Sequence, residues 1–446
     1  MIRAIVLAAG KGKRMKSSRP KVLHDLCGRP MLWYVLNGLR EAGIDDVVVV
    51  VAADVRERIA SFGVRTVVQT EQRGTGDAVR TALDGMPENA SGRIVIASGD
   101  MPLISGSIFG DVVRELDGER VDLALVTVKM PLPSSFGRIV RRDGAVDGIV
   151  EARDATPEQL ALDEMNAGVY AFSEPALRHA IGGLRADNAQ GEFYLTDTVR
   201  GLVEAGKRVH AVSAPKHEDA IGINDRVELA RARRAMNERI CERHMRDGVT
   251  IVDPATTYLE PELTIGRDTV IYPNTTISRL SEIGEGCVIG PNARVSYAKI
   301  GDGSEIRDSV VVDSSIGRGV TVGPYAHVRN RADLGDEVQI GNFVEIKKSA
   351  FAAGSKAKHL SYVGDAIVGE EANIGAGTVT CNYDGRQKNQ TTIGRDVSIG
   401  SNTSLIAPVT LGDGALTGAG SVVTRDVRPG ERVVGNPARP LPKRSQ

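Results

Sequence analysis

The sequence predicts an α/β domain with a mixed, mostly parallel sheet, followed by a parallel β-helix, with a long helix between them. Three observations predict this. Apolar strand-like runs alternate with helix-like segments over residues 1–226, apolar residues recur at helical spacing over 227–247, and an aliphatic residue recurs every six positions within 248–446. We therefore expect two domains joined by a helix.

The first part contains four strand candidates separated by amphipathic segments. Residues 2–8, 47–51, 66–69 and 94–98 are rich in Val and Ile, whereas 31–42 and 76–83 carry apolar residues at helical spacing. Apolar strands that alternate with helices indicate a largely parallel sheet that is covered by helices on both faces.

The segment 225–245 has a different pattern. Leu229, Ala232, Met236 and Ile240 are spaced by three or four residues, and Arg and Glu fill most of the other positions. This spacing predicts an amphipathic helix of about five to six turns. We expect this helix to connect the two domains.

A six-residue period dominates the rest of the chain. It runs through three aliphatic series: Ile265, Ile271, Ile277, Ile283, Ile289 and Val295; Ile316, Val322, Val328, Leu334, Ile340 and Ile346; and Ile393, Ile399, Leu405 and Leu411. Each unit can supply a short strand and a turn, so three units make one coil of a β-helix with the aliphatic side chains inside. Residues 347–362 and 381–391 break the phase, and we expect both to form external loops that carry binding groups.

Composition restricts the function. The 446 residues include 56 Lys and Arg against 57 Asp and Glu, which argues against a nucleic-acid-binding protein. No apolar run approaches the ~20 residues that span a bilayer, and the first residues predict a strand instead of a signal peptide. Cys27, Cys241, Cys287 and Cys381 form no CxxC pair, so we expect free thiols, no metal cluster and a cytoplasmic location.

A glycine-rich turn follows the first strand. Gly10 and Gly12 let backbone N–H groups approach a phosphate, and Arg14 and Lys21 add positive charge. The spacing matches neither GxGxxG nor GxxxxGK[ST], so it indicates neither a dinucleotide site nor a P-loop. Taken alone, the turn is equally compatible with a tight loop whose basic side chains are solvated.

Further motifs accompany this turn. Residues 7–15 read LAAGKGKRM and precede Pro20 and Lys21; residues 69–75 read QTEQRGT, 99–103 GDMPL, 136–138 FGR, 148–151 GIVE, 166–168 NAG and 222–224 GIN. Together they closely resemble the sugar-nucleotide pyrophosphorylases over roughly the first 226 residues. The resemblance implies a Rossmann-like domain that binds UTP and UDP-N-acetylglucosamine through Leu7, Ala8, Ala9, Gly10, Lys21, Gln69, Gly74, Thr75, Ser98, Gly99, Asp100, Gly137, Glu151, Asn166 and Asn224. The family has an aromatic residue where this chain has Ser98.

The chemistry of uridylyl transfer gives these residues roles. A sugar-phosphate oxygen attacks the α-phosphorus of UTP and pyrophosphate leaves, so Mg²⁺ is needed to bridge the phosphates. We expect Asp100 and Asn224 to be the metal ligands, and Arg14 and Lys21 to stabilise the transition state as catalytic residues. No general base is required, because the attacking phosphate is already ionised. Outside this context Asp100 would be a capping carboxylate and Asn224 a turn residue.

The segments that break the six-residue period hold polar residues. Residues 342–348 read NFVEIKK, 358–362 KHLSY, 373–377 NIGAG and 381–385 CNYDG. Acetyl transfer from a thioester to an amine needs a base that works near neutral pH, and histidine is suited to this. His359 is the candidate base, and Glu345 could orient its imidazole. A lone histidine in a loop is more often simply solvated.

With these segments the resemblance extends over nearly the whole chain, to the bifunctional N-acetylglucosamine-1-phosphate uridyltransferase/glucosamine-1-phosphate acetyltransferases. It implies that glucosamine 1-phosphate is held by Arg329, Lys347, Tyr362, Asn373 and Lys388, and acetyl-CoA by Ala376, Asn382, Tyr383, Ser401 and Ala419. Arg432 or Arg439 could meet the CoA phosphate. The resemblance also implies a left-handed β-helix and a homotrimer with acetyltransferase sites between subunits.

Three functions remain in competition. The first is a two-reaction enzyme of cell-wall precursor synthesis, in which acetylation precedes uridylyl transfer. The second is a sugar-1-phosphate nucleotidyltransferase whose β-helix only oligomerises or regulates, as in enzymes that make ADP-glucose or GDP-mannose. The third is a non-catalytic solenoid with a vestigial first domain. The loop with His359 and the pair Asn382 and Tyr383 favour the first.

Overall fold

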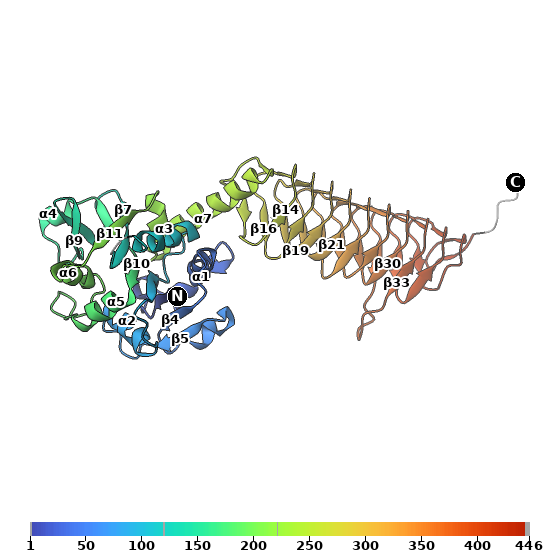
Figure 1. Ribbon diagram of the computed structural model, residues 1–446. Helices are drawn as coiled ribbons and strands as arrows, with labels where there is room; N and C mark the ends of the chain where they lie inside the picture. The colour runs from blue at the N-terminus through green and yellow to red at the C-terminus, as the bar shows by residue number, and fades with distance from the viewer. Residues whose placement is uncertain (1, 119–120, 221, 442–446) are drawn as a thin grey trace. The chain divides into compact units, whose positions relative to one another are not determined.

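The computed structural model describes residues 2–118, 121–220 and 222–441, and the chain forms two compact units, Met1–Met236 and Asn237–Gln446. The first unit is built around a sheet in the order β11-β7-β10-β6-β1-β4-β5 (Figure 1). Its strands are β1 (Ile2–Ala8), β4 (Val47–Val51), β5 (Arg65–Val68), β6 (Arg93–Ser98), β7 (Leu123–Lys129), β10 (Glu164–Ser173) and β11 (Val209–Ser213). The four predicted strands are confirmed to within a residue at each end.

The sheet is mixed because β10 and the hairpin before it run antiparallel to their neighbours. β1, β4, β5 and β6 pair in parallel, as do β7 and β11, but β10 runs antiparallel to both β6 and β7. A hairpin of β8 (Arg138–Arg142) and β9 (Ala145–Val150) precedes β10, and β8 pairs with β10 where Met165 faces Arg138. This antiparallel return places the polar residues of β10 beside the ends of the parallel strands.

Helices cover both faces of this sheet, as predicted. One core holds Val6, Val49 and Val95 with residues of α1 (Met31–Glu41) and α3 (Gly106–Leu116). The other holds Ile5, Val48 and residues of α2 (Thr75–Asp84), α5 (Glu174–Gly182) and α6 (Asp197–Glu204). Successive strand residues therefore enter opposite cores, as the pleat requires. Short elements complete the unit: β2 (Asp25–Leu26), β3 (Arg29–Pro30), α4 (Pro157–Leu160), η1 (Lys13–Met15), η2 (Lys21–Leu23), η3 (Glu57–Phe62) and η4 (His217–Ala220).

Helix α7 (Arg226–Arg246) is continuous, and the division between the two units falls inside it. The Asp225 carboxylate accepts hydrogen bonds from the backbone N–H groups of Val227 and Glu228 and so caps its start. In the second unit, the buried amide of Asn237 donates to the carbonyl of Thr257 at 2.8 Å and accepts from the N–H of Leu259 at 3.2 Å. This side chain ties the helix to the first coil of the β-helix.

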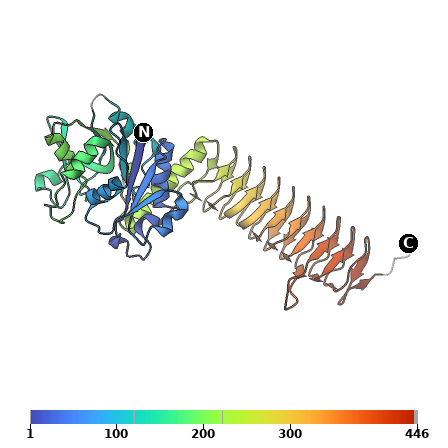
Figure 2. The ribbon, with the colours of Figure 1, turned by 60° about the horizontal axis from the view of Figure 1, so that its bottom comes forward.

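The second unit is a parallel β-helix (Figure 2). One ladder contains β12 (Thr250–Ile251), β15 (Val270–Ile271), β18 (Val288–Ile289), β20 (Glu305–Ile306), β22 (Thr321–Val322), β25 (Gln339–Asn342), β28 (Lys356–His359), β31 (Asn373–Ile374), β34 (Ser398–Ile399), β37 (Leu416–Thr417) and β39 (Arg432–Val434), with β40 (Arg439–Pro440) antiparallel at its end.

The other sheet holds two interleaved ladders, which share β19 (Arg294–Ile300) and β21 (Val310–Ile316). The first adds β13 (Tyr258–Leu259), β16 (Thr276–Ser278), β23 (His327–Arg329), β26 (Glu345–Lys347), β29 (Tyr362–Gly364), β32 (Val379–Cys381), β35 (Ser404–Ile406) and β38 (Val422–Val423). The second adds β14 (Thr264–Ile265), β17 (Glu282–Ile283), β24 (Ala332–Leu334), β27 (Ala350–Phe351), β30 (Ala366–Val368), β33 (Thr391–Ile393) and β36 (Val409–Leu411).

The pairing confirms that three six-residue units make one coil. Ile265 pairs with Ile283, one coil further on, and Ile271 pairs with Ile289. The glycine after the aliphatic residue has a steric reason: a Cβ at Gly284 would lie 2.7 Å from the backbone nitrogen of Asp302 on the next coil. The stacked aliphatic residues are buried and form the interior.

One of the two predictions of an external loop is wrong. Residues 347–362 stay in the coil, because Phe351 and Ala357 take the interior positions next to Leu334 and Ile340. The step from Leu334 to Phe351 is one residue shorter than a regular coil, which appears in the sequence as an interruption. The segment between β32 and β33 does leave the coil, and Figure 1 shows it projecting beside β30 and β33.

Candidate functional site

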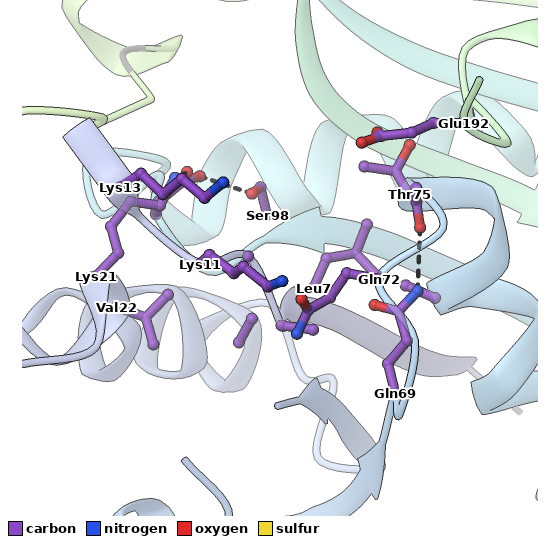
Figure 3. A pocket seen from close by; sticks show the side chains of 16 residues that line it. Leu7, Lys11, Lys13, Lys21, Val22, Gln69, Gln72, Thr75, Ser98 and Glu192 are labelled. Carbon is purple, nitrogen blue, oxygen red and sulfur yellow. Dashed lines mark hydrogen bonds and ion pairs between the residues drawn. The ribbon is translucent and has the colours of Figure 1, made fainter. Parts of the chain in front are cut away.

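A pocket of about 490 Å³ opens where β1, β5 and β6 end (Figure 3). It is lined by Leu7, Ala8, Ala9, Gly10, Lys11, Lys13, Lys21, Val22, Gln69, Gln72, Gly74, Thr75, Ala78, Ser98, Asp100 and Glu192. The carboxyl ends of parallel strands meet at one edge of a sheet, which is where ligands bind in such folds. The structure therefore brings the glycine-rich turn, the segment 69–75 and the end of β6 together, although they are far apart in the sequence.

Lys21 lies at the centre of the most polar part of this pocket. Its Nζ forms an ion pair with Oδ2 of Asp100 and lies 3.3 Å from Oδ1 of Asn224. The Ser98 hydroxyl, which stands where the family has an aromatic residue, donates to Oδ1 of Asp100 at 2.6 Å. The two side-chain oxygens predicted to bind a metal thus converge on one cationic group.

The backbone holds these two oxygens together. The N–H of Ile223 donates to the carbonyl of Asp100 at 3.0 Å, and the N–H of Asn224 donates to the Glu228 carboxylate at 2.6 Å. Hard oxygen donors are what Mg²⁺ prefers, so the pair fits that ion. Among the described residues no group of three or more His, Cys, Asp or Glu could hold a metal, so further ligands would have to be phosphate oxygens or water.

The predicted sugar-side residues form a second cluster. The N–H of Asn166 donates to the carbonyl of Gly137 at 2.9 Å, and the Thr196 hydroxyl donates to the carboxylate of Glu151 at 3.1 Å. Burial raises the pKa of Glu151 above its ordinary value. The N–H of Leu195, next to Thr196, donates to the hydroxyl of Thr75 at 3.0 Å, which connects this cluster to the pocket.

Sequence reasoning missed several pocket residues. Lys11, Lys13, Gln72 and Glu192 line the pocket, and their types carry no signal in isolation, because polar residues of loops are usually solvated. Tyr194 has a buried hydroxyl near the Glu151 cluster, and burial raises its pKa.

Besides Gly137, Glu151 and Asn166 of the second cluster, three predicted residues lie outside the pocket lining. Arg14 is exposed on η1, next to Lys13. Gly99 is linked to the pocket through its N–H, which donates to the carbonyl of Leu7 at 2.9 Å. Asn224 meets the pocket through Lys21, as described above.

On the β-helix, the candidate base and three of the five predicted acetyl-CoA residues lie along one edge. Asn342 and His359 face each other on neighbouring coils, and the pairings Ala357–Ile374, Ile374–Ile399 and Ile399–Thr417 place Ala376, Ser401 and Ala419 next in the same column. Three small side chains therefore follow His359 over about 14 Å, three strand spacings.

His359 is oriented by Asn342, not by Glu345. Its Nδ1 lies 2.8 Å from Oδ1 of Asn342. The expected partner, Glu345, instead accepts from Nε and Nη2 of Arg329 at 2.8 and 2.6 Å. The expected loop is also absent at this point, because His359 is the last residue of strand β28.

A second edge carries a cluster of cationic groups. Arg329 and Lys347 pair in register on neighbouring coils, and the next position is Gly364, where a Cβ would collide with the Tyr362 hydroxyl. A hydrogen bond between the side chains of Lys347 and Lys388 lowers the pKa of Lys347 and raises that of Lys388. These features suit an anion, because Lys347 has no carboxylate partner among the described ion pairs.

The projecting loop is anchored beside this cluster. The amide of Asn382, which is almost fully buried, donates to Asp365 at 2.7 Å and to the Tyr362 hydroxyl at 3.3 Å. The following Tyr383 is exposed. Asn373 is the first residue of β31, on the other sheet from Arg329, Lys347 and Tyr362. One chain therefore divides the predicted acetyltransferase residues between two sheets.

Each of the two units matches models of known protein families. The MobA-like NTP transferase domain matches residues 4–155, the GMPPB C-terminal domain matches 254–344, and six bacterial transferase hexapeptide repeats match 390–425. No helix among the described residues is long and apolar enough to cross a membrane.

Curated relatives match almost the whole chain. A Bifunctional protein GlmU from Geobacillus sp. (strain WCH70) is 46% identical, covering 95% of this chain and 93% of its own length. Those from Streptomyces avermitilis and Clostridium beijerinckii are 44% and 42% identical, covering 96% and 97% of this chain and 91% and 95% of their own. A solved putative glucose-1-phosphate thymidylyltransferase from Bacillus anthracis is 19% identical over 52% of this chain and 94% of its own, with a TM-score of 0.43, which is too weak a likeness to interpret.

Proposed function

Because the chain belongs to the family of bifunctional GlmU proteins, we propose that its 490 Å³ pocket is the uridylyltransferase site and that the two edges of its β-helix supply the acetyltransferase site. The protein is an enzyme with UDP-N-acetylglucosamine pyrophosphorylase and glucosamine-1-phosphate acetyltransferase activities. We assign uridylyl transfer to residues 1–226, the connection to the helix 227–247 and acetyl transfer to residues 248–446.

The observation that carries the first assignment is the convergence of Lys21, Asp100 and Asn224. Asp100 and Asn224 would hold Mg²⁺, which supplies charge neutralisation between the phosphates when bound. Lys21 is then free to bind the α-phosphate, and Lys11, Lys13 and Arg14 stand around the open side for the leaving pyrophosphate. The attacking N-acetylglucosamine 1-phosphate is placed by the cluster of Gly137, Glu151 and Asn166.

The uracil is read by Gln69, Gly74 and Thr75, beside the strand end formed by Leu7, Ala8, Ala9 and Gly10. Ser98 and Gly99 support Asp100. The contacts that favour this arrangement are the pocket lining and the hydrogen bond from Ser98 to Asp100.

Acetyl transfer is assigned to His359. A carbonyl oxygen can only accept, so Asn342 holds the proton on Nδ1 and leaves Nε2 as the basic nitrogen. Nε2 takes a proton from the glucosamine amine as the amine nitrogen bonds to the acetyl carbon. The bond from that carbon to sulfur breaks, and the sulfur takes the proton from Nε2, so that CoA leaves as the thiol. The column of Ala376, Ser401 and Ala419 leaves room for the extended arm of acetyl-CoA, and Asn382 and Tyr383, at the second edge, are assigned as further acetyl-CoA contacts.

The phosphate of glucosamine 1-phosphate is assigned to Arg329, Lys347 and Lys388, with Tyr362 and Asn373 as further contacts. His359 ends β28 on one sheet, whereas Arg329 and Lys347 lie on the other sheet, so a small substrate that must bridge base and cations favours a site completed by a second copy. We therefore propose a homotrimer of left-handed β-helices, in the cytoplasm, where the free thiols stay reduced. Arg432 or Arg439 would meet the CoA phosphate.

One experiment tests both assignments. The purified protein is incubated with glucosamine 1-phosphate, acetyl-CoA, UTP and Mg²⁺, and the products are identified by mass with each component omitted in turn. We expect UDP-N-acetylglucosamine, free CoA and pyrophosphate, with N-acetylglucosamine 1-phosphate accumulating when UTP is left out. A nucleotide series of UTP, dTTP, ATP and GTP should show a preference for UTP. A preference for ATP or GTP, without acetyl transfer, would support the nucleotidyltransferase with a regulatory β-helix.

A further inference from the structure

Two hydrogen bonds restrict the orientation of the Gln69 side chain in the pocket. Its Nε2 donates to the carbonyl of Gly74 at 3.2 Å and to the carboxylate of Asp77 at 2.8 Å. Its side chain is buried yet lines the pocket, and Figure 3 shows the amide oxygen pointing toward the side on which Leu7 lies. Within the described part of the chain this Oε1 has no hydrogen-bond partner.

Hydrogen-bonding chemistry alone also requires this orientation of the Gln69 amide. A carbonyl oxygen and a carboxylate can only accept hydrogen bonds, so both must face the NH₂ end of the amide. Turning the amide over would place Oε1 against two acceptors and leave both donors facing the pocket. Asp77 contributes the shorter of the two bonds and the charged one, which is the stronger type. It comes from the first turn of helix α2, outside the pocket lining.

The geometry points to Asp77 as a positioning residue that makes Gln69 select uracil over cytosine, because it fixes the Gln69 amide as an acceptor toward the base. This inference rests on the proposed function, in which Gln69 reads the base. The edge of uracil presents a donor, N3–H, between two acceptors. Cytosine presents an acceptor at N3. If Oε1 of Gln69 can only accept, it pairs with N3–H of uracil and is repelled by the acceptor N3 of cytosine.

The test compares nucleotides on Asp77→Asn and Asp77→Ala. Both variants remove the charged acceptor, so that only the longer contact with the Gly74 carbonyl opposes turning the amide over and donating to N3 of cytosine. We expect the ratio of kcat/KM for UTP to that for CTP to fall about tenfold, the size expected from losing one charge-assisted hydrogen bond. The ratio for UTP to 5-methyl-UTP should stay within about twofold, because the two bases share one hydrogen-bonding edge.

Matched controls separate this role from a structural one. Asp84→Asn changes an exposed aspartate at the other end of the same helix and should leave every ratio unchanged. Acetyl transfer by both Asp77 variants should equal that of the parent protein. A simple loss of packing would lower turnover of UTP, CTP and 5-methyl-UTP together and leave their ratios constant.

The outcomes distinguish a failure of the proposed function from a failure of the role assigned to Asp77. If the parent protein shows no preference for UTP over CTP, the proposed reading of uracil by Gln69 is wrong. If the parent prefers UTP and the Asp77 variants keep that preference within about twofold, the proposed function stands and the role of Asp77 is overturned. A fall in the UTP to CTP ratio with an unchanged UTP to 5-methyl-UTP ratio supports it.

Discussion

The imidazole Nδ1 of His359 lies 2.8 Å from the amide oxygen of Asn342, which occupies the same position on the preceding coil. The two residues are 17 positions apart, a distance that matches neither a helix turn nor a hairpin. Only the length of one coil brings them together. The contact leaves Nε2 of His359 as the nitrogen available for proton transfer.

Replacing the proposed base should remove acetyl transfer. General-base help contributes about 10²–10⁴-fold, so His359→Ala should lower the acetyl kcat by about that factor, with smaller changes in KM. Uridylyl transfer should be unchanged. The neighbouring exposed Lys358→Ala serves as the control. If His359→Ala keeps more than about a third of the parent kcat, the amine arrives neutral or uses a water relay, and the assignment is wrong.

Changing Asn342 should alter the base without removing it. Asn342→Ala frees the imidazole to adopt either tautomer, and we expect the acetyl kcat to fall about tenfold, less than for His359→Ala. Asn342→Asp keeps an acceptor and adds a negative charge, which favours the protonated imidazole. The acid limb of the acetyl pH–rate profile should therefore move to higher pH in Asn342→Asp. An unmoved limb would mean that Asn342 has only a structural role.

The proposed metal ligand can be tested against the second activity. Asp100→Ala removes one of the two side-chain oxygens that meet at Lys21, so uridylyl transfer should fall below detection while acetyl transfer stays within about twofold. Asp111→Ala, an exposed aspartate of α3, is the control for general effects. Equal loss of both activities in folded Asp100→Ala would show that the two sites are not separable.

The raised pKa of Glu151 predicts a pH-dependent stability effect. Burial disfavours its charged form, so the folded protein holds this proton to a higher pH than the unfolded chain does. The stability contribution is complete below the unfolded pKa, about 4.3, and is lost as pH rises through the higher folded pKa. Glu151→Gln cannot lose a proton.

The difference in melting temperature between Glu151→Gln and the parent should therefore shift in favour of the variant between about pH 4 and pH 7. Glu158→Gln changes an exposed glutamate whose folded pKa is lowered, so its difference should shift in favour of the parent, and mainly below the unfolded pKa of about 4.3. A difference for Glu151→Gln that does not change with pH would contradict a raised pKa at this site.

Asn237 should be the most sensitive polar residue where α7 enters the β-helix. Asn237→Ala leaves the carbonyl of Thr257 and the N–H of Leu259 buried without their partner, so we expect a loss of about 3 kcal/mol from two unmade hydrogen bonds. Denaturant unfolding measures it. Asn37→Ala, a helical asparagine whose amide donates to the exposed Glu41 carboxylate, should cost under about 1 kcal/mol.

Regular spacing made the architecture predictable. Ile265, Ile283 and their counterparts lie inside the β-helix because the same six-residue unit repeats, and the strand 47–51 is buried on both faces as a continuous apolar run must be. The phase break at 347–362 misled the prediction, because a coil one residue shorter keeps its interior with Phe351 and Ala357.

Site residues that belong to a motif could be predicted from the sequence. Site residues that act through a tertiary contact could not. Lys21 and Asp100 were identified from their motifs, and the structure brings them into one ion pair. Asn342 and Asp77 were not identified, because each acts through a side chain that it meets only after folding. The type and spacing of such residues are unremarkable in the sequence.

The loop between β32 and β33 leaves its coil without disturbing the stack, because Ala366, Ile367 and Val368 still pair with residues 391–393 on its far side. The length of that corner is therefore independent of the register of the layers. Corners such as Gly284, where even a methyl group would strike Asp302, allow no such freedom. Peptides grafted into the corner at 384–388 should be tolerated by the fold. Insertions and deletions during evolution should be accepted at the same corner, because they leave the length of every other coil unchanged.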